Sequence, residues 1–244
     1  MIKPYYETEL GKLYHGDCLE IMPQLDPVDL VLTDPPYVGM SRGLKYIQGS
    51  GIGCYNHKVQ CETIGDPWNA TLDWVKTAFS LAQKGFLSFC SYHFLSELKV
   101  AVNYKPIALL TWHKRNTPIS VANVPRYTEE YVWAFSKGGG LNWRYLKKTL
   151  IDIPKLATGA MAPKERLIDR DKKALHPTQK PLAVIMYLMG IGGDSILDPF
   201  LGSGTTAVAC ERLNRKWIGI EIEEKYCEIA AKRIYAEASQ LKWC

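Results

Sequence analysis

The sequence predicts an α/β fold, in which a mostly parallel central sheet is flanked by helices in a single domain of 244 residues. Short apolar runs alternate with segments of helical periodicity, which indicates parallel strands joined by right-handed crossovers. Two of these runs, residues 28–33 and 195–197, lead into an Asp-Pro step. Because proline stops a strand, both acids are expected at carboxyl strand ends, where open α/β sheets bind ligands.

The composition is that of a globular protein from a reducing compartment. Apolar residues make up 47% and charged residues 23% of the chain, which is an ordinary balance. No apolar run approaches the roughly 20 residues that span a bilayer, and the N-terminus lacks the apolar core of a secretory signal. The seven cysteines form no Cys-x-x-Cys pair, which argues against a disulfide framework and predicts a cytoplasmic protein.

The N-terminal third predicts a strand over residues 12–15 that ends at a Gly-Asp turn, a helix over 18–25, and a buried strand over 28–33. Residues 38–66 are rich in glycine and polar side chains, and this segment is too long for an ordinary turn, so it is either a functional loop or disordered. Within it, Cys54, His57 and Cys61 could ligate a metal. A fourth ligand at a sensible spacing is missing, so no metal is predicted.

The middle of the chain continues the alternation. A helix is predicted over residues 72–84 with Gly85 as its stop, followed by a strand over 86–90 and a helix over 94–103. Residues 106–112 and 131–135 read as strands. The alternation of strands and helices implies parallel pairing through right-handed crossovers.

The C-terminal third has the clearest pattern. Helices are predicted over residues 182–189, 207–213 and 227–238, and strands over 195–198 and 216–221. The first helix has a proline near its first turn, and the last strand ends in the acid Glu221.

Positive charge is concentrated in residues 141–175. The chain carries a formal net charge of +5, and this segment, with nine Lys or Arg and four acids, accounts for the whole excess. Trp143 and Tyr145 lie among the basic residues, a combination that suits nucleic acid. We interpret the segment as a basic insertion, although a solvated surface loop would have the same composition.

The first Asp-Pro step predicts a site for a planar amine. Asp34 and the Pro35 carbonyl can each accept one amine hydrogen, and the Tyr37 ring can stack on the ring that carries the amine. Two consecutive prolines, Pro35 and Pro36, keep this corner outside the strand ladder. By itself the tetrapeptide would fit an ordinary proline-stiffened turn.

The second Asp-Pro step opens a nucleotide-binding pattern. Strand, Gly202-x-Gly204 turn and helix are followed by a strand that ends in Glu221, 17 residues after Gly204. The glycines let the backbone approach a ligand, and the acid can bind both hydroxyls of a ribose. The third glycine typical of dinucleotide sites is missing, which disfavours a pyrophosphate-containing cofactor.

Together these motifs resemble the β-class DNA amino-methyltransferases, in which the catalytic half precedes the half that binds S-adenosylmethionine (SAM). Residues 176–181, 112–118 and 16–18 are also similar to patterns of that family. The resemblance covers nearly the whole chain apart from residues 38–66 and 141–175. It implies a Rossmann-like SAM-dependent methyltransferase fold with a circularly permuted motif order, the cofactor SAM and the partner double-stranded DNA.

The resemblance also implies roles for individual residues. Asp34 and Pro35 would hold the exocyclic amine, and Tyr37 would stack on a flipped base. Asp17 would approach the adenine of SAM, Glu221 its ribose, and Thr178 and Lys180 its carboxylate. The expected catalytic residues are Asp34, Pro35, Pro36 and Tyr37; the cofactor-binding residues are Asp17, Thr178, Lys180, Asp198, Pro199, Phe200, Gly202, Ser203, Gly204, Thr205 and Glu221; the DNA-binding residues are Arg42, Lys45, Lys114, Arg115, Arg144, Lys147 and Lys148.

Several alternatives stay open at this stage. Asp34 at the first motif position favours the N6 amine of adenine over the N4 amine of cytosine. RNA or a protein amide could also be the substrate, although the basic insertion argues against a protein. A non-catalytic protein of the same fold would bind SAM or DNA without transfer. A homodimer and a cognate restriction endonuclease are further partners that the resemblance suggests.

Overall fold

The computed structural model describes residues 2–36, 67–91, 95–114, 128–154, 165, 167–168 and 179–241, with side chains described from residue 72 onward in the second range. The strands are β1 (Tyr6–Glu7), β2 (Gly11–His15), β3 (Val28–Thr33), β4 (Ala82–Cys90), β5 (Ala108–His113), β6 (Glu129–Ser136), β7 (Leu150–Ile151), β8 (Ser195–Asp198) and β9 (Lys216–Glu221). The helices are α1 (Cys18–Ile21), α2 (Pro67–Leu81), α3 (Leu95–Val102), α4 (Leu182–Met189), α5 (Thr205–Arg212) and α6 (Glu224–Leu241), with 3-10 turns η1 (Met22–Gln24) and η3 (Trp143–Tyr145).

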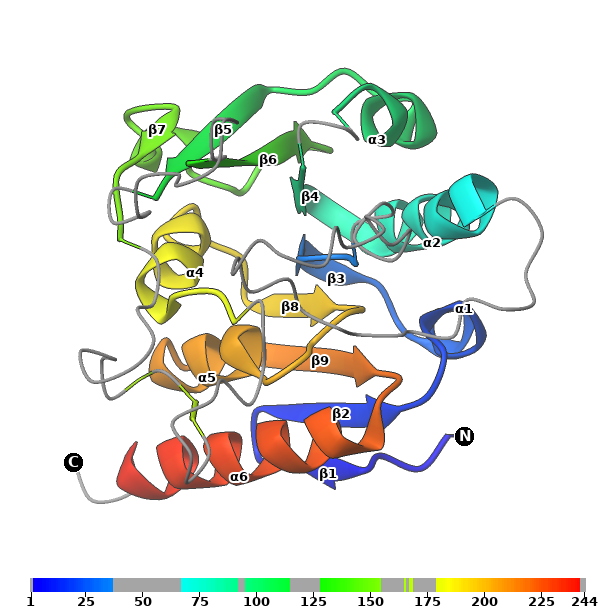
Figure 1. Cartoon of the computed structure of the whole chain (residues 1–244), viewed down its shortest axis with the longest axis vertical. Helices are drawn as coiled ribbons and strands as arrows, with labels where there is room; N and C mark the ends of the chain where they lie inside the picture. Colours follow the sequence, from blue (N-terminus) through cyan, green and yellow to red (C-terminus); the bar gives the residue numbers. More distant parts are fainter. Residues whose placement is uncertain are drawn as a thin grey trace, which may run out of the picture.

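The strands form one sheet in the spatial order β1-β2-β9-β8-β3-β4-β6-β5-β7, which Figure 1 shows from β1 beside α6 to β7 at the far end. The five strands from β2 to β4 pair in parallel. The predicted α/β fold with a mostly parallel sheet is thus confirmed.

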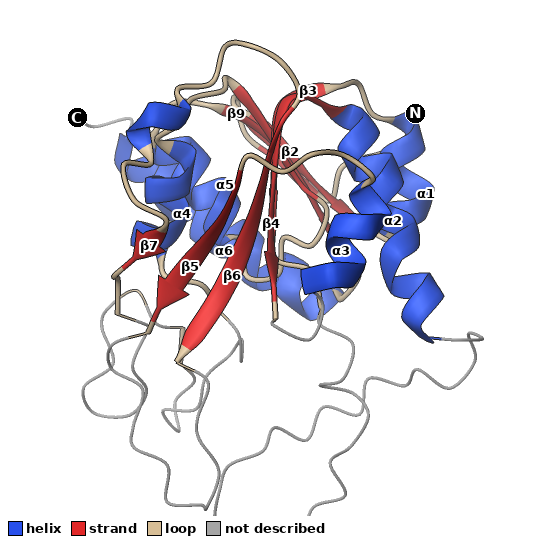
Figure 2. Cartoon of the chain, turned by 90° about the horizontal axis from the view of Figure 1, so that it is seen from above, coloured by secondary structure: helices blue, strands red, loops and turns tan. Residues whose placement is uncertain are grey.

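Helices cover both faces of the sheet, as Figure 2 shows. Helices α1, α2 and α3 lie on one face and bury Ile21, Trp74 and Leu98 against it. Helices α4, α5 and α6 lie on the other face, where α4 and α6 contribute Leu188 and Ile234 to a second apolar cluster. The sheet is therefore the middle of three layers, and the carboxyl ends of its parallel strands form one shared edge.

Two predictions about the middle of the chain are wrong. Helix α2 ends at Leu81 and β4 begins directly at Ala82, so Gly85 lies inside a strand rather than stopping a helix. A Cβ on Gly85 would lie 2.6 Å from Leu141 Cδ1, so glycine serves close packing here. Strand β6 pairs antiparallel with both β4 and β5 instead of in parallel.

The first part of the basic segment belongs to the sheet. Strand β7 pairs in parallel with β5, and Ile151 is buried in the core. The Trp112 indole donates a hydrogen bond of 2.6 Å to the Ile153 carbonyl, and Trp143 packs against the same core. Residues 141–154 thus extend the sheet at its outer edge.

No helix in the described part of the chain combines the length and the apolar composition that crossing a membrane requires.

Candidate active site

The two Asp-Pro steps meet at the carboxyl edge of the sheet. Strands β3 and β8 are neighbours, with Val31 opposite Leu197. The Thr33 hydroxyl donates a hydrogen bond of 2.8 Å to Asp198 Oδ1, and both residues are buried. This contact joins the last residue of β3, directly before Asp34, to the acid that opens the glycine loop.

The Asp198 carboxylate accepts three hydrogen bonds. Besides Thr33, the Thr206 hydroxyl donates to Oδ2 at 2.6 Å, and the Phe200 N–H donates to Oδ1 at 3.1 Å. Burial nevertheless raises the pKa of Asp198 to about 6. The side chain therefore holds both ends of the loop between β8 and α5, through Phe200 and Thr206.

The glycine loop has the backbone that the motif predicts. Gly202 has φ 55° and Gly204 has φ 84°, which are left-handed conformations that favour glycine. A Cβ on Gly204 would lie 3.0 Å from the Ala230 Cβ on α6, so this position also needs the small residue for packing. Pro199 is buried, and the Phe200 ring lies edge-on to Trp74 with centroids 4.9 Å apart.

An arginine that the motif does not contain also holds this loop. Arg233 of α6 donates to the Ser203 carbonyl at 2.5 Å, and its Nη1 lies 3.2 Å from both Ser203 Oγ and Thr205 Oγ1. Burial lowers the pKa of the guanidinium to about 10, and the group remains charged at neutral pH. A single basic residue in an amphipathic helix gives no sequence signal, so sequence reasoning missed Arg233.

Glu221 ends β9 beside the glycine loop. Its carboxylate accepts hydrogen bonds of 2.8 Å from the N–H groups of Gly202 and Glu223, and burial raises its pKa. Asp17 follows β2, which is the neighbour of β9 in the sheet. The Gly16 N–H donates a hydrogen bond of 3.0 Å to the Glu221 carbonyl, so Asp17 lies close to Glu221. The Asp17 side chain accepts from the Leu19 N–H at 2.8 Å and so caps α1.

The predicted catalytic corner follows β3 directly. Asp34 is half-buried, Pro35 is buried and Pro36 is exposed. Lys180 Nζ contacts Asp34 Oδ2 in an ion pair, and the same nitrogen lies 5.1 Å from the centre of the Phe89 ring. Lys180 is thus placed against the predicted catalytic acid.

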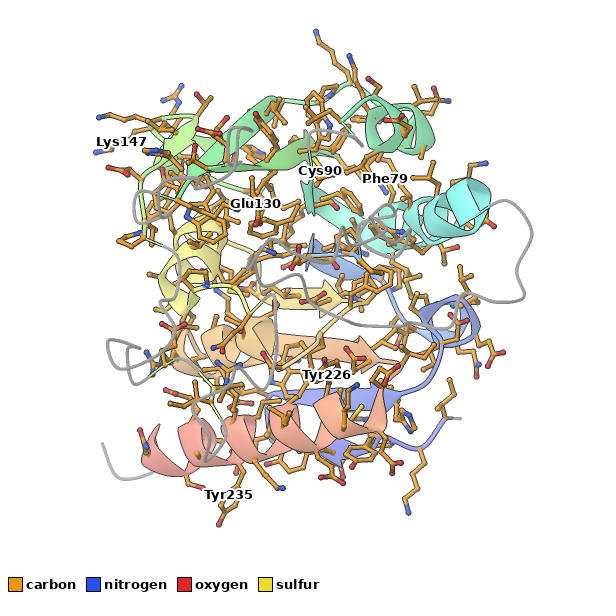
Figure 3. The ribbon with its side chains drawn as sticks, viewed as in Figure 1. Phe79, Cys90, Glu130, Lys147, Tyr226 and Tyr235 are labelled. Carbon is orange, nitrogen blue, oxygen red and sulfur yellow. The ribbon has the colours of Figure 1, made fainter. Side chains whose placement is uncertain are left out.

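Glu130, at the start of β6, extends this pair into a network. Its Oε2 lies 3.2 Å from Lys180 Nζ, and its Oε1 accepts a hydrogen bond of 2.9 Å from Lys114 Nζ. Among the described residues Oε2 has no donor in hydrogen-bond geometry, so its attraction to Lys180 is that of an ion pair. Figure 3 labels Glu130 and, nearby, Cys90, which ends β4.

Opposite charges set the ionisation of this network. Burial alone would lower the pKa of Lys180, but Asp34 and Glu130 outweigh it and raise that pKa. Burial likewise opposes ionisation of Glu130, yet Lys180 and Lys114 hold the pKa of Glu130 below its ordinary value. Lys180 and Glu130 are therefore both charged at neutral pH.

The structure separates some predicted DNA-binding residues from this edge. Arg144 lies in η3, where the Trp143 indole donates to Ser136 Oγ at 3.0 Å, and Ser136 is at the opposite end of the sheet. Lys147 and Lys148 are exposed between η3 and β7, and Figure 3 shows Lys147 at the outer, β7 side of the molecule.

Some predicted residues lie outside the described part of the chain: Tyr37, Arg42, Lys45, Cys54, His57, Cys61, Arg115 and Thr178. Their predicted roles stay predictions.

The hydrogen-bonding groups and the glycine backbone at this edge fit SAM. Each oxygen of the Glu221 carboxylate accepts one N–H, which leaves acceptor capacity for two ribose hydroxyls. Gly202 and Gly204 present backbone without side chains in front of α5. The fold and these residues define a SAM-dependent methyltransferase.

The chain belongs to the DNA methylase family, whose model for N6 and N4 methyltransferases matches residues 28–232. It is therefore an enzyme that transfers a methyl group from SAM to DNA, as the motif resemblance predicted.

Named relatives span almost the entire chain. The Type II methyltransferase M2.DpnII of Streptococcus pneumoniae is 30% identical, over 97% of this chain and 94% of its own length. The Type II methyltransferase M2.LlaDCHI of Lactococcus lactis subsp. cremoris is 31% identical, over 96% and 93%.

Solved structures agree on the fold. The crystal structure of the M1.HpyAVI–SAM complex is 27% identical, with a TM-score of 0.59 over 92% of this chain and all of that one. The cytosine-N4-specific PvuII DNA methyltransferase, at 20% identity, has a TM-score of 0.70 over 98% and 95%.

Proposed function

We propose that this enzyme methylates the N6 amine of adenine at a specific sequence in double-stranded DNA. The hydrogen bond between Thr33 and Asp198 carries the proposal. It sets Asp34, the first residue after β3, beside the loop that would hold the methyl donor. The amine and the methyl group would therefore meet at one edge of the sheet.

The proposed chemistry is direct transfer with positioning as its main contribution. The adenine amine is a poor nucleophile because its lone pair is delocalised into the ring. The Asp34 carboxylate and the Pro35 carbonyl would each accept a hydrogen bond from one N–H of the amine and so localise the lone pair on its nitrogen. Residues 198–205 and Glu221 would hold SAM, which supplies an electrophilic methyl group on a sulfonium. As the N–C bond forms, the methyl–sulfur bond would break, S-adenosylhomocysteine would leave, and one amine proton would pass to solvent. No cysteine is needed as a nucleophile.

Adenine is favoured over cytosine by the acid at the first motif position, Asp34, on the resemblance described above. The relatives named as Type II methyltransferases support action at defined DNA sites. Cytosine N4 is the alternative product that the test below distinguishes.

The target base would have to leave the duplex, at a cost of roughly a few kcal/mol. We propose that Tyr37 stacks on the extruded base, and that residues 38–66 and the basic segment 141–175 contact DNA within one methyltransferase domain. We also propose a cognate restriction endonuclease and a second copy of the chain as partners, and a cytoplasmic location.

Incubation with methyl-labelled SAM and duplex DNA of known sequence tests this function. The methylated DNA is digested to nucleosides, and the labelled positions are mapped. N6-methyladenine at one recurring sequence is expected. N4-methylcytosine, or SAM binding without transfer to any DNA, would overturn the proposal.

A further inference from the structure

Four charged side chains of alternating sign lie in a row at the catalytic edge: Asp34, Lys180, Glu130 and Lys114. They come from the end of β3, the segment before α4, the start of β6 and the end of β5. Exposed fractions of the four side chains are 22%, 8%, 21% and 15%. The four side chains are thus largely shielded from solvent, where an unpaired charge would carry a large desolvation cost.

Glu130 lies between the two lysines of this row, and its backbone is part of a strand. It lies opposite Trp112 in the β5–β6 ladder, so its backbone is fixed by strand pairing. One carboxylate oxygen contacts Lys114 and the other faces Lys180. Lys180, which is also held over the Phe89 ring, therefore has two carboxylates competing for one ammonium group.

The competition matters for Asp34. An ammonium shared between two carboxylates draws less electron density from either than one paired with a single acid. Asp34 must accept a hydrogen of the substrate amine, so a weaker hold by Lys180 leaves it a better acceptor. We propose that Glu130 is a positioning residue that shares Lys180 with Asp34 and thereby keeps the Asp34 carboxylate available to the substrate amine. This inference rests on the proposed methyl transfer.

Other titratable groups also face Asp34. Cys90 ends β4, and burial raises the pKa of its thiol to about 12, with Asp34 and Glu130 adding to the rise. Asp198 of β8, whose pKa is about 6, also interacts with Asp34. Glu130 differs from both in its ion pair with Lys180, and it also differs from Cys90 in being charged at neutral pH.

Glu130→Gln tests the proposal, with Glu129→Gln as the matched control. Glu129 is the preceding residue, so it points to the other face of β6, and its carboxylate accepts from the Thr128 hydroxyl at 2.5 Å. The readouts are kcat as a function of pH, in which the acid limb reports protonation of Asp34, and the Kd for SAM by calorimetry.

In Glu130→Gln, Lys180 pairs with Asp34 alone. We expect the acid limb to move down by about one pH unit, and kcat at pH 8 to fall about tenfold. The Kd for SAM stays within about twofold of the wild type, because the cofactor loop is untouched. Lys114→Met should do the opposite to the limb, since Glu130 then holds Lys180 more strongly and the limb moves up.

Glu130→Gln together with Lys114→Met removes one charge of each sign and serves if the single variant does not fold. It should keep the kcat loss of Glu130→Gln. An acid limb that stays in place in both Glu130→Gln and the double variant, or that moves equally in Glu129→Gln, overturns the role of Glu130. Absence of DNA methylation by the wild type would instead overturn the proposed function itself.

Discussion

The Thr33 hydroxyl donates a hydrogen bond of 2.8 Å to Asp198, across 165 residues of sequence. One partner ends the strand that presents Asp34, the proposed catalytic acid, and the other opens the loop that we propose binds SAM. Both residues are buried, so water cannot replace this hydrogen bond if it is lost. The bond therefore links the two halves of the site directly.

Thr33→Val should loosen this link. Valine has the shape of threonine without the hydroxyl, so Asp198 loses one of its three donors. We expect the free energy of unfolding to fall by about 1–2 kcal/mol and the Kd for SAM to rise several-fold. Urea unfolding and calorimetry measure the two effects. Thr33→Ser keeps the hydroxyl and should bind SAM as the wild type does; equal Kd values for Thr33→Val and Thr33→Ser would show that the bond does not orient the loop.

Asp198 should give the protein an unusual pH dependence. Burial raises its pKa from 3.8 to about 6 in the folded chain, so the folded state binds this proton more tightly than the unfolded state. The contribution to stability is therefore greatest below the unfolded pKa and is lost as pH rises through the folded pKa. The loss is at most about 3 kcal/mol.

Asp198→Asn removes this titration. Unfolding free energies of the variant and the wild type, compared at intervals from pH 4 to pH 7, should diverge steadily in favour of the variant as pH rises. A difference that stays constant over this range would mean that the pKa of Asp198 is not raised.

Arg233 should matter more than its neighbour Arg212. Arg233→Met removes buried hydrogen bonds to Ser203 and Thr205, so we expect a loss of about 1–3 kcal/mol in unfolding free energy and weaker SAM binding. Arg212 also joins α5 to α6, through Glu237, but its side chain is 44% exposed. Arg212→Met should cost less than about 1 kcal/mol and leave the Kd for SAM unchanged. Similar Kd values for both variants would contradict the role assigned to Arg233.

Helices and strands whose ends carry a clear sequence signal could be predicted almost to the residue. Strand β3, helix α4 and strand β9 match the predicted ranges, because each is an apolar run closed by proline, glycine or an acid. The start of β4 could not be found this way. Helix α2 passes into it without a loop, and Gly85, a typical helix stop, is needed there for contact with Leu141.

The direction of a strand in the sheet could not be predicted from the local sequence pattern either. The apolar run of β6 looks like that of any parallel strand, yet it pairs antiparallel on both sides. Direction depends on which neighbours are available in the folded sheet, and residue periodicity does not encode it.

The motif residues of the site were predictable, whereas the charges that support them were not. Asp34 and Asp198 each precede a proline at a strand end, and Glu221 is the acid that ends an apolar strand, which marks them in the sequence. Glu130 is one of two adjacent acids at the start of an apolar strand, and only the fold reveals that it faces Lys180. Lys114, predicted to contact DNA, forms an ion pair with Glu130 in the structure, and its DNA contact stays a prediction.

The most direct measurement of the central claim compares SAM binding and methyl transfer in Asp34→Ala. Asp34 lies beside the cofactor loop without forming part of it, so calorimetry should give a Kd for SAM close to that of the wild type. Transfer of labelled methyl to DNA should be lost, because the amine has lost its acceptor. Transfer at a near-normal rate, with the same methylated base in the nucleoside digest, would contradict the account of this site.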